Sequence, residues 1–180
     1  MSRTAIDGVV SLRSALRAEG GTVAGLLGDE VDLGPDPESP GLAQRAAAGP
    51  RAEGNGTEYE LLLEMIIEGS RLHYGPQRVV QTDDADLALL LGDQLYALGL
   101  SRLAALGDVD AIIELADVIS LVSRAYAAGD PGLAEVVWDA GAIAIGWGNS
   151  ARHEAAKALA RAGDPGAAAA LSAAAARLGS

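Results

Sequence analysis

The 180-residue sequence predicts an all-α fold, a single helical bundle of about six to eight helices. Apolar residues recur with a helical period through most of the chain, and no stretch alternates apolar and polar residues between hairpin turns as a strand would. Glycine followed by aspartate repeatedly interrupts this pattern, which is typical of one helix ending and the next being capped. Aromatic residues make up only 3% of the chain, so we expect a core of leucine, isoleucine, valine and alanine.

The first 56 residues are expected to differ from the rest of the chain. A helix is predicted from Ala5 to Glu19, and the following Gly20–Gly21 ends it. Residues 28–56 contain four of the seven prolines and many glycines, which predicts a loosely held arm with a short helix near residues 42–48. The predicted domains are therefore an N-terminal helix with its arm (1–56) and a helical core domain (57–180).

The core domain should begin with two long helices. Thr57 and Glu60 have the spacing of a capping box, and Gly75–Pro76 should end the first helix. The second should run from about Asp84 to Leu106, and it is apolar on nearly every side, which predicts a buried helix over 87–106 at the centre of the bundle.

Glycine–aspartate pairs divide the remaining sequence into further helices. After Gly107–Asp108, a helix should turn Ile112, Leu115, Ala116, Ile119 and Val122 to one side and Asp110, Glu114, Asp117 and Arg124 to the opposite side. Gly129–Asp130–Pro131 and Gly163–Asp164–Pro165 repeat the turn 34 residues apart, with a break at 146–149 between them. The last predicted helix covers residues 166–178.

The charge and composition exclude several classes of function. A formal charge of −12 and a pI near 4.4 disfavour binding to nucleic acid or to anionic membrane surfaces. The chain has no cysteine, and its uncharged stretch between Asp139 and Arg152 is 12 residues, too short to span a bilayer. No signal sequence is recognised, and the arginine- and alanine-rich composition is typical of GC-rich bacteria. We expect a cytoplasmic protein that forms a homo- or heterodimer through its alanine-rich helical surface.

Acidic residues provide the candidate sites. Glu60, Glu64 and Glu68 recur every four residues on one helix face, which indicates either a solvated face, with Arg71 beside Glu68, or a magnesium site. The cluster of Asp83, Asp84 and Asp86 is explained by a helix start.

Three further positions remain as candidates. Asp93, in the most apolar helix, should be buried and paired with an arginine or a backbone donor from a neighbouring helix. His73 is favoured by the C-terminal end of its helix, and the loop at 146–150 before Arg152 and His153 could form an anion pocket. None of these residues forms a recognised catalytic motif.

The segment from Glu60 to Asp130 resembles the trans-polyprenyl diphosphate synthases of the isoprenoid synthase fold. In that family an aspartate-rich helix precedes a helix with a Gly-Asp-x-Leu signature, which Gly92–Asp93–Gln94–Leu95 and Ala97 match, and Ile112, Leu115, Ala116, Ile119 and Leu121 match the helix after it. Catalytic members carry two DDxxD motifs for Mg²⁺. Here the matching helix has Glu64 and Glu68 at the outer positions, without the second acid and without a second motif.

The resemblance therefore implies a small, non-catalytic subunit of a heteromeric, heptaprenyl-type synthase. Its partner would be a catalytic polyprenyl diphosphate synthase subunit. The chain would need no cofactor alone, and Mg²⁺ would bind in the complex through Glu64 and Glu68. Arg71 and Arg78 are the candidate contacts to the diphosphate, and Gly92 and Asp93 are expected to be structural or interface residues.

Two alternatives stay open. The 34-residue step between Gly129 and Gly163 is the period of tetratricopeptide-like hairpins, which would make the chain a protein-interaction scaffold. The other alternative is a Mg²⁺-dependent prenyltransferase that acts alone through Glu64 and Glu68.

Overall fold

A computed structural model describes residues 3–29, 31 and 36–178 of the chain. The described part is all-α, as predicted, with one isolated β-bridge between Leu27 and Val80. Its helices are α1 (Ala5–Glu19), α2 (Gly21–Gly25), α3 (Leu42–Ala47), α4 (Gly56–Tyr74), α5 (Ala85–Leu106), α6 (Val109–Ala127), α7 (Pro131–Trp147), α8 (Ala151–Ala162) and α9 (Ala167–Leu178), with a 3₁₀ turn η1 (Pro50–Ala52). Among the described helices, none is both long and apolar enough to cross a membrane.

The chain forms two compact units. Unit 1 consists of residues 1–44 and 57–106, and unit 2 consists of residues 45–56 and 107–180. One of these boundaries lies at the expected position after residue 56. The boundary after residue 106 was not expected from the sequence, which predicted one core domain over 57–180.

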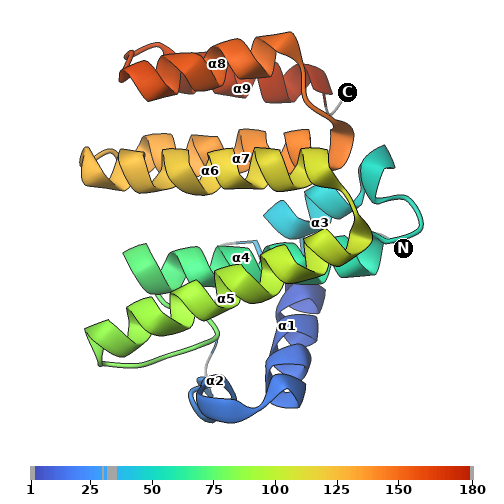
Figure 1. Cartoon of the computed structure of the whole chain (residues 1–180), viewed down its shortest axis with the longest axis vertical. Helices are drawn as coiled ribbons and strands as arrows, with labels where there is room; N and C mark the ends of the chain where they lie inside the picture. The colour runs from blue at the N-terminus through green and yellow to red at the C-terminus, as the bar shows by residue number, and fades with distance from the viewer. Residues whose placement is uncertain (1–2, 30, 32–35, 179–180) are drawn as a thin grey trace. The chain divides into compact units, whose positions relative to one another are not determined.

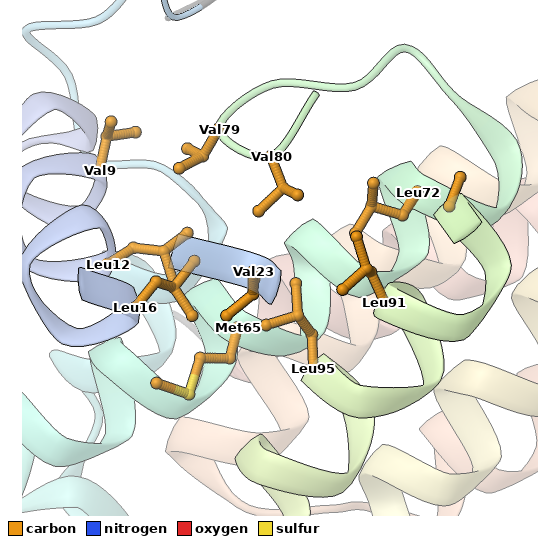
Figure 2. Close-up of a cluster of buried hydrophobic side chains, with 11 residues drawn as sticks. Val9, Leu12, Leu16, Val23, Met65, Leu72, Val79, Val80, Leu91 and Leu95 are labelled. Atoms are coloured by element: carbon orange, nitrogen blue, oxygen red, sulfur yellow. The ribbon is translucent and has the colours of Figure 1, made fainter. Parts of the chain in front are cut away.

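Unit 1 is built around α1, α4 and α5. Its core joins α1 and α2 to α4 and α5 through aliphatic side chains (Figure 2). Leu12, Leu16 and Leu95 are fully buried there. The connection between α4 and α5 contributes Val79 and Val80, which are held beside residues 26–28 by backbone hydrogen bonds from Gly28 N to Val79 O (3.0 Å) and from Gln81 N to Leu26 O (2.8 Å).

Helix α5 is buried on one side and exposed to solvent on the other, so the prediction of a helix buried on all sides was wrong. Leu91, Leu95 and Leu103 face the interior, whereas Leu89 is 45% exposed and Leu90 is 67% exposed. The apolar pattern of the sequence could not reveal this, because leucine on an exposed helix face gives the same pattern as leucine in a core.

Unit 2 consists largely of two helical hairpins, α6–α7 and α8–α9 (Figure 1). The predicted caps begin three of these helices: Asp108, Asp130 and Ser150 accept backbone hydrogen bonds from Ala111, Leu133 and His153. Helix α7 packs against α9, and α6 contacts α8, so that equivalent helices of the two hairpins lie together.

Part of the N-terminal arm is packed rather than loosely held. Ala43, Ala46 and Ala52 are at most 1% exposed. The backbones at Gly49 and Gly146 approach so closely that a Cβ at either position would overlap backbone atoms. Residues 30 and 32–35 of the predicted arm lie outside the described residues.

Candidate functional site

The three glutamates of α4 are buried, so their interpretation as a solvated helix face was wrong. Glu60, Glu64 and Glu68 are 2%, 3% and 0% exposed. Glu60 does not form the predicted capping box; its Oε2 instead accepts a hydrogen bond from Arg3 Nε at 2.6 Å. Glu68 binds groups of the α4–α5 connection rather than Arg71. Arg71 donates to the carbonyl of Pro76 at 3.4 Å.

Arg78 neutralises the other two glutamates. Its Nη2 donates to Glu64 Oε2 at 2.7 Å, and its Nε donates to Glu68 Oε2 at 3.1 Å. Burial opposes the charged form of Arg78, but the charges of Glu64 and Glu68 outweigh burial and raise its pKa above the ordinary value. The guanidinium that was considered for diphosphate is therefore committed to an internal ion pair.

The remaining carboxylate oxygens of this pair also have donors. Glu68 Oε1 accepts the backbone N–H groups of Val79 at 2.6 Å and Val80 at 2.9 Å. Glu64 Oε1 accepts a hydrogen bond from Gln44 Nε2 at 3.0 Å. Mg²⁺ could bind to Glu64 and Glu68 only if the ion pairs of these residues with Arg78 were broken. We call Glu64, Glu68, Arg78 and Gln44 the α4 cluster.

Gly92 and Asp93 both meet the side chain of His73. A Cβ on Gly92 would lie 2.7 Å from His73 Nε2, which is too close for a side chain at that position. Asp93 Oδ1 lies 3.1 Å from His73 Nε2, and the Asp93 side chain is 72% exposed rather than buried. Its partner comes from a neighbouring helix, α4, but it is a histidine rather than the predicted arginine or backbone donor.

The ring of His73 also stacks on Tyr96 of α5, with centroids 5.3 Å apart. Burial raises the pKa of Tyr96 to about 12, although a hydrogen bond with Ser70 opposes the shift. Asp84 behaves as predicted for a helix start, since its Oδ1 accepts the N–H of Leu87 at 3.0 Å, and Asp86 lies in the first turn of α5.

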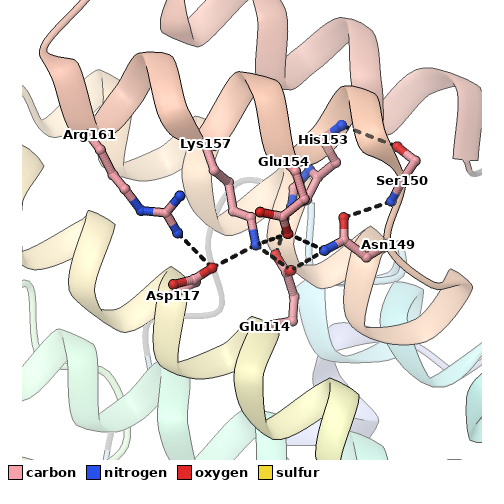
Figure 3. Close-up of polar contacts among 8 residues, drawn as sticks. All are labelled: Glu114, Asp117, Asn149, Ser150, His153, Glu154, Lys157 and Arg161. Atoms are coloured by element: carbon pink, nitrogen blue, oxygen red, sulfur yellow. Dashed lines mark hydrogen bonds and ion pairs between the residues drawn. The ribbon is translucent and has the colours of Figure 1, made fainter.

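A second buried cluster lies in unit 2, and the sequence analysis did not predict it (Figure 3). Lys157 on α8 is 1% exposed, and its ammonium group forms ion pairs with three carboxylates. Its Nζ lies 2.7 Å from Glu114 Oε2, 2.8 Å from Asp117 Oδ2 and 2.7 Å from Glu154 Oε1. Arg161 adds a second cation at Asp117, 2.7 Å away.

Glu114 is the centre of this cluster. It is 3% exposed, although the sequence placed it on the polar side of its helix. Its Oε1 lies 2.7 Å from Nε2 of the buried His153, and its Oε2 also accepts from Asn149 at 3.2 Å. We call these two residues, with Lys157, Asp117, Glu154, Arg161 and Asn149, the α6 cluster.

The ion pairs of the α6 cluster stabilise its charged forms. Burial opposes the charge of Lys157, but its three carboxylate partners outweigh burial and raise its pKa. For Asp117, Lys157 and Arg161 outweigh burial and lower the carboxyl pKa; for Glu154, Lys157 and Asn149 have the same effect.

Three carboxylates of the α6 cluster also lie as close to one another as the ligands of a metal ion would. One oxygen from each of Glu114, Asp117 and Glu154 lies within 4.8 Å of the others. The ammonium group of Lys157 contacts one oxygen of each of these carboxylates, so it already supplies the positive charge a cation would bring. We therefore interpret the cluster as an internal salt-bridge network.

This network also accounts for the loop that was considered as an anion pocket. Asn149 donates to the carboxylates of Glu114 and Glu154, and Ser150 Oγ accepts the N–H of His153 at 3.1 Å. A signal for the cluster existed in the sequence, because Lys157 is the only lysine and follows His153 by one helical turn. Its partners Glu114 and Asp117 lie about 40 residues away, however, and local spacing does not identify them.

A groove runs beside the turns of the two hairpins in unit 2. Its volume is about 510 Å³.

 The lining includes residues from both hairpins, among them Leu121, Leu133 and Ala160, and the turn residues Asp130 and Asp164. The lining is thus mainly aliphatic and includes three charged residues, Arg124, Asp130 and Asp164.

The comparisons with known proteins do not identify a family. No protein-family model, no curated protein and no solved structure matches the chain.

Proposed function

We propose that this chain is a non-catalytic protein-interaction scaffold built from helical hairpins. The observation that carries the proposal is the pairing of α6–α7 with α8–α9, in which Gly129–Asp130–Pro131 and Gly163–Asp164–Pro165 form equivalent turns 34 residues apart. Stacked hairpins of this kind bury a continuous core and present an extended surface to a partner.

The α6 cluster supports a scaffold because it ties the two hairpins together. Lys157 and His153 belong to the second hairpin, whereas Glu114 and Asp117 belong to the first. Ion pairs with several partners restrict how the hairpins can shift against each other. A surface that keeps its shape before binding loses less conformational entropy when a partner arrives.

The groove beside the hairpin turns is the proposed partner site. Leu121 and Leu133 offer aliphatic surface, and the charged residues Arg124, Asp130 and Asp164 also line the groove. A mainly apolar surface that includes a few charged groups is typical of protein-binding surfaces. A partner segment with aliphatic side chains and nearby charged residues would fit this chemistry.

Two variants of unit 2 test the groove. Leu133→Glu places a charge in the groove at a half-buried position, and Val109→Glu is the matched control because Val109 is 62% exposed and does not line the groove. Each variant would be used to co-purify proteins from the source organism, followed by binding measurements with the recovered partner. We expect Leu133→Glu to weaken binding at least about tenfold while Val109→Glu does not. Equal binding by both variants would contradict the groove as the site.

A second proposal is that the partner is a catalytic polyprenyl diphosphate synthase, with this chain as its small subunit. The observation that favours a supporting role is the ion pairing of Glu64 and Glu68 with Arg78, since carboxylates held in this way are not free to bind Mg²⁺. The resemblance of residues 60–130 to that family motivates the choice of partner, and Mg²⁺ would belong to the complex.

Prenyl-transfer assays separate this proposal from the others. A DDxxD-bearing synthase would be assayed with and without the chain, and product length would be measured. A change in activity or product length would support the subunit function, and no change would contradict it. Turnover by the isolated chain would instead support the Mg²⁺-dependent prenyltransferase that acts alone.

A further inference from the structure

A second hollow of unit 2 lies at the N-terminal end of α6. Its volume is about 410 Å³, which falls in the range of about 300 to 1,000 Å³ that is common for ligand sites. Its lining combines charged, polar and aliphatic residues, among them Arg51, Asp110, Ile113, Glu114, Ala144 and Asn149. We call this hollow the α6 pocket.

The α6 pocket is separate from the groove beside the hairpin turns. The groove is lined by α6 residues from Leu121 onward, whereas the pocket is lined by Asp110, Ile113 and Glu114. Leu121 follows Asp110 by 11 residues, about three helical turns, so the two hollows lie roughly 16 Å apart along α6. A substitution in one hollow can therefore leave the other unchanged.

Arg51 brings an unsatisfied donor to the α6 pocket. Its Nη2 pairs with Asp108, and its Nη1 lies 3.7 Å from Asp110 Oδ2, which is farther than a hydrogen bond. Its Nε is buried and has no hydrogen-bond partner among the described residues. A buried N–H group without a partner is costly, so a ligand that brings an oxygen acceptor to this atom gains a hydrogen bond.

The charges around the α6 pocket favour a cationic ligand. The side chain of Asp110 is 81% exposed, so a ligand can reach its carboxylate. Arg51 is paired with Asp108, and the buried Lys157 is paired with Glu114 at 2.7 Å. An anionic ligand would therefore meet Asp110 beside two cations that are already neutralised, whereas a cationic ligand would meet a complementary charge.

We propose that the α6 pocket binds a lysine side chain of a partner protein. The inference rests on the proposed scaffold function and gives the chemistry of a second contact with the partner. The lysine stem lies against Ile113 and Ala144, and its ammonium group pairs with Asp110. The backbone carbonyl of the same lysine accepts from Arg51 Nε. Lysine suits a hollow that opens to solvent, because its methylene groups pack on apolar surface while its ammonium group stays near water.

The occupant is a partner protein rather than a second copy of this chain. The chain has a single lysine, Lys157, which is 1% exposed and forms ion pairs with three carboxylates. The formal charge of −12 makes two copies repel each other and attracts a basic partner.

Small probes test the α6 pocket without a whole partner. The protein would be titrated at low salt with Nα-acetyl-lysine N-methylamide, and the backbone amide resonances would be followed by NMR. We expect saturable shifts at Ile113 and Gly148, which line the pocket, and weaker binding when salt is added. Nα-acetyl-norleucine N-methylamide lacks the ammonium group, and pentylamine lacks the carbonyl; each should bind at least about threefold more weakly.

A charge-removing variant tests the proposed ion pair. Asp110→Asn changes an exposed side chain, so the fold should tolerate it, and circular dichroism should match the unaltered chain. It should weaken binding of the lysine probe about threefold or more and leave binding of the norleucine probe unchanged. Glu135→Gln is the matched control, because Glu135 is exposed on α7 and does not line the pocket. An equal effect of the two variants on the lysine probe would overturn the proposal.

The probes also separate lysine from other occupants. A norleucine probe that binds as tightly as the lysine probe would show that the pocket recognises only apolar groups. An arginine probe, Nα-acetyl-arginine N-methylamide, that binds more tightly would assign the pocket to a different side chain, and shifts without saturation would show only non-specific attraction. Each of these results would overturn the proposal. The groove variant Leu133→Glu should bind the lysine probe normally, so a failure of the pocket and a failure of the groove would be distinguishable.

Discussion

The two units each contain a buried charge cluster centred on helix glutamates, but the clusters connect different parts of the chain. The ion pairs of the α4 cluster join a helix to its own following connection, since Arg78 lies 10 residues from Glu68 and 14 from Glu64. The α6 cluster joins two hairpins, and Lys157 lies 43 residues from Glu114. One cluster therefore holds a loop in place, whereas the other holds separate helices together.

The clusters also differ in how exposed their side chains are to solvent. In the α4 cluster the two carboxylates and Arg78 have side chains at most 9% exposed. In the α6 cluster Glu114, His153 and Lys157 are buried, but Asp117, Glu154 and Arg161 have side chains that are 30%, 48% and 42% exposed. Water can therefore replace lost partners in the α6 cluster more readily than in the α4 cluster.

The largest expected effect comes from Arg78→Met. This change leaves Glu64 and Glu68 buried without their cation, and breaking a buried ion pair from one side costs about 3 to 5 kcal/mol. Urea denaturation should show that loss in the free energy of unfolding. Arg78→Lys should lose less, because it keeps the charge. A loss below about 1 kcal/mol for Arg78→Met would show that the α4 cluster contributes little.

Lys157→Met should cost less than Arg78→Met, about 2 to 3 kcal/mol. Glu114 keeps His153 and Asn149 as partners, and Asp117 and Glu154 can turn to water. The same denaturation measurement applies, with Arg152→Met as the matched control, because Arg152 lies on the exposed side of the same helix. A greater loss for Lys157→Met than for Arg78→Met would reverse the comparison between the clusters.

Gly8→Ala should perturb the α4 cluster by steric overlap rather than by a change of charge. A Cβ at Gly8 would overlap Gln44 Nε2 and Glu64 Oε1, which are hydrogen-bonded to each other. We expect a loss of about 1 to 3 kcal/mol from the forced displacement. Gly25→Ala is the control, because a Cβ there meets no atom within 4 Å. Equal stability of the two variants would show that Gln44 and Glu64 can move aside without lowering the free energy of unfolding.

Acidification should produce the smallest effect, and it should act on the α6 cluster. The folded pKa values of Asp117 and Glu154 lie below their ordinary values of 3.8 and 4.5. Their contribution to stability is therefore complete above those values and is lost as the pH falls through the lowered folded values. Because both groups are partly exposed, each should contribute less than about 1 kcal/mol.

A pair of denaturation series tests this effect. The free energy of unfolding would be measured between about pH 6 and pH 2 for the unaltered chain and for Lys157→Met. The variant should show the weaker dependence on pH, since Lys157 is a cause of both shifts. The same dependence in both proteins would contradict the assignment of the shifts to Lys157.

Most of the helix boundaries could be predicted because their signals are local. Asp108, Asp130 and Ser150 each bind a backbone N–H three residues later, and Gly163 adopts the left-handed conformation that ends α8. The first helix was predicted with its observed bounds, Ala5 to Glu19. Such contacts involve residues within one turn, so the sequence contains both partners in a short window.

The candidate residues were harder to predict because their environments depend on distant partners. Glu64, Glu68 and Glu114 were expected at polar surfaces and are buried, whereas Asp93 was expected to be buried and is exposed. A carboxylate favours burial only when a cation and hydrogen-bond donors reach it. For Glu114 those groups come from α8, and helical periodicity within α6 contains no information about them.

The sequence by itself determined that this chain is helical and where most helices begin and end, because backbone capping and helix-breaking residues act over a few positions. Only the tertiary structure decided which faces are covered. It decided that α5 leaves Leu89 and Leu90 in solvent, and that the boundary between the units follows α5. Burial and ion pairing depend on contacts between residues far apart in the chain, and those contacts form only when the helices pack.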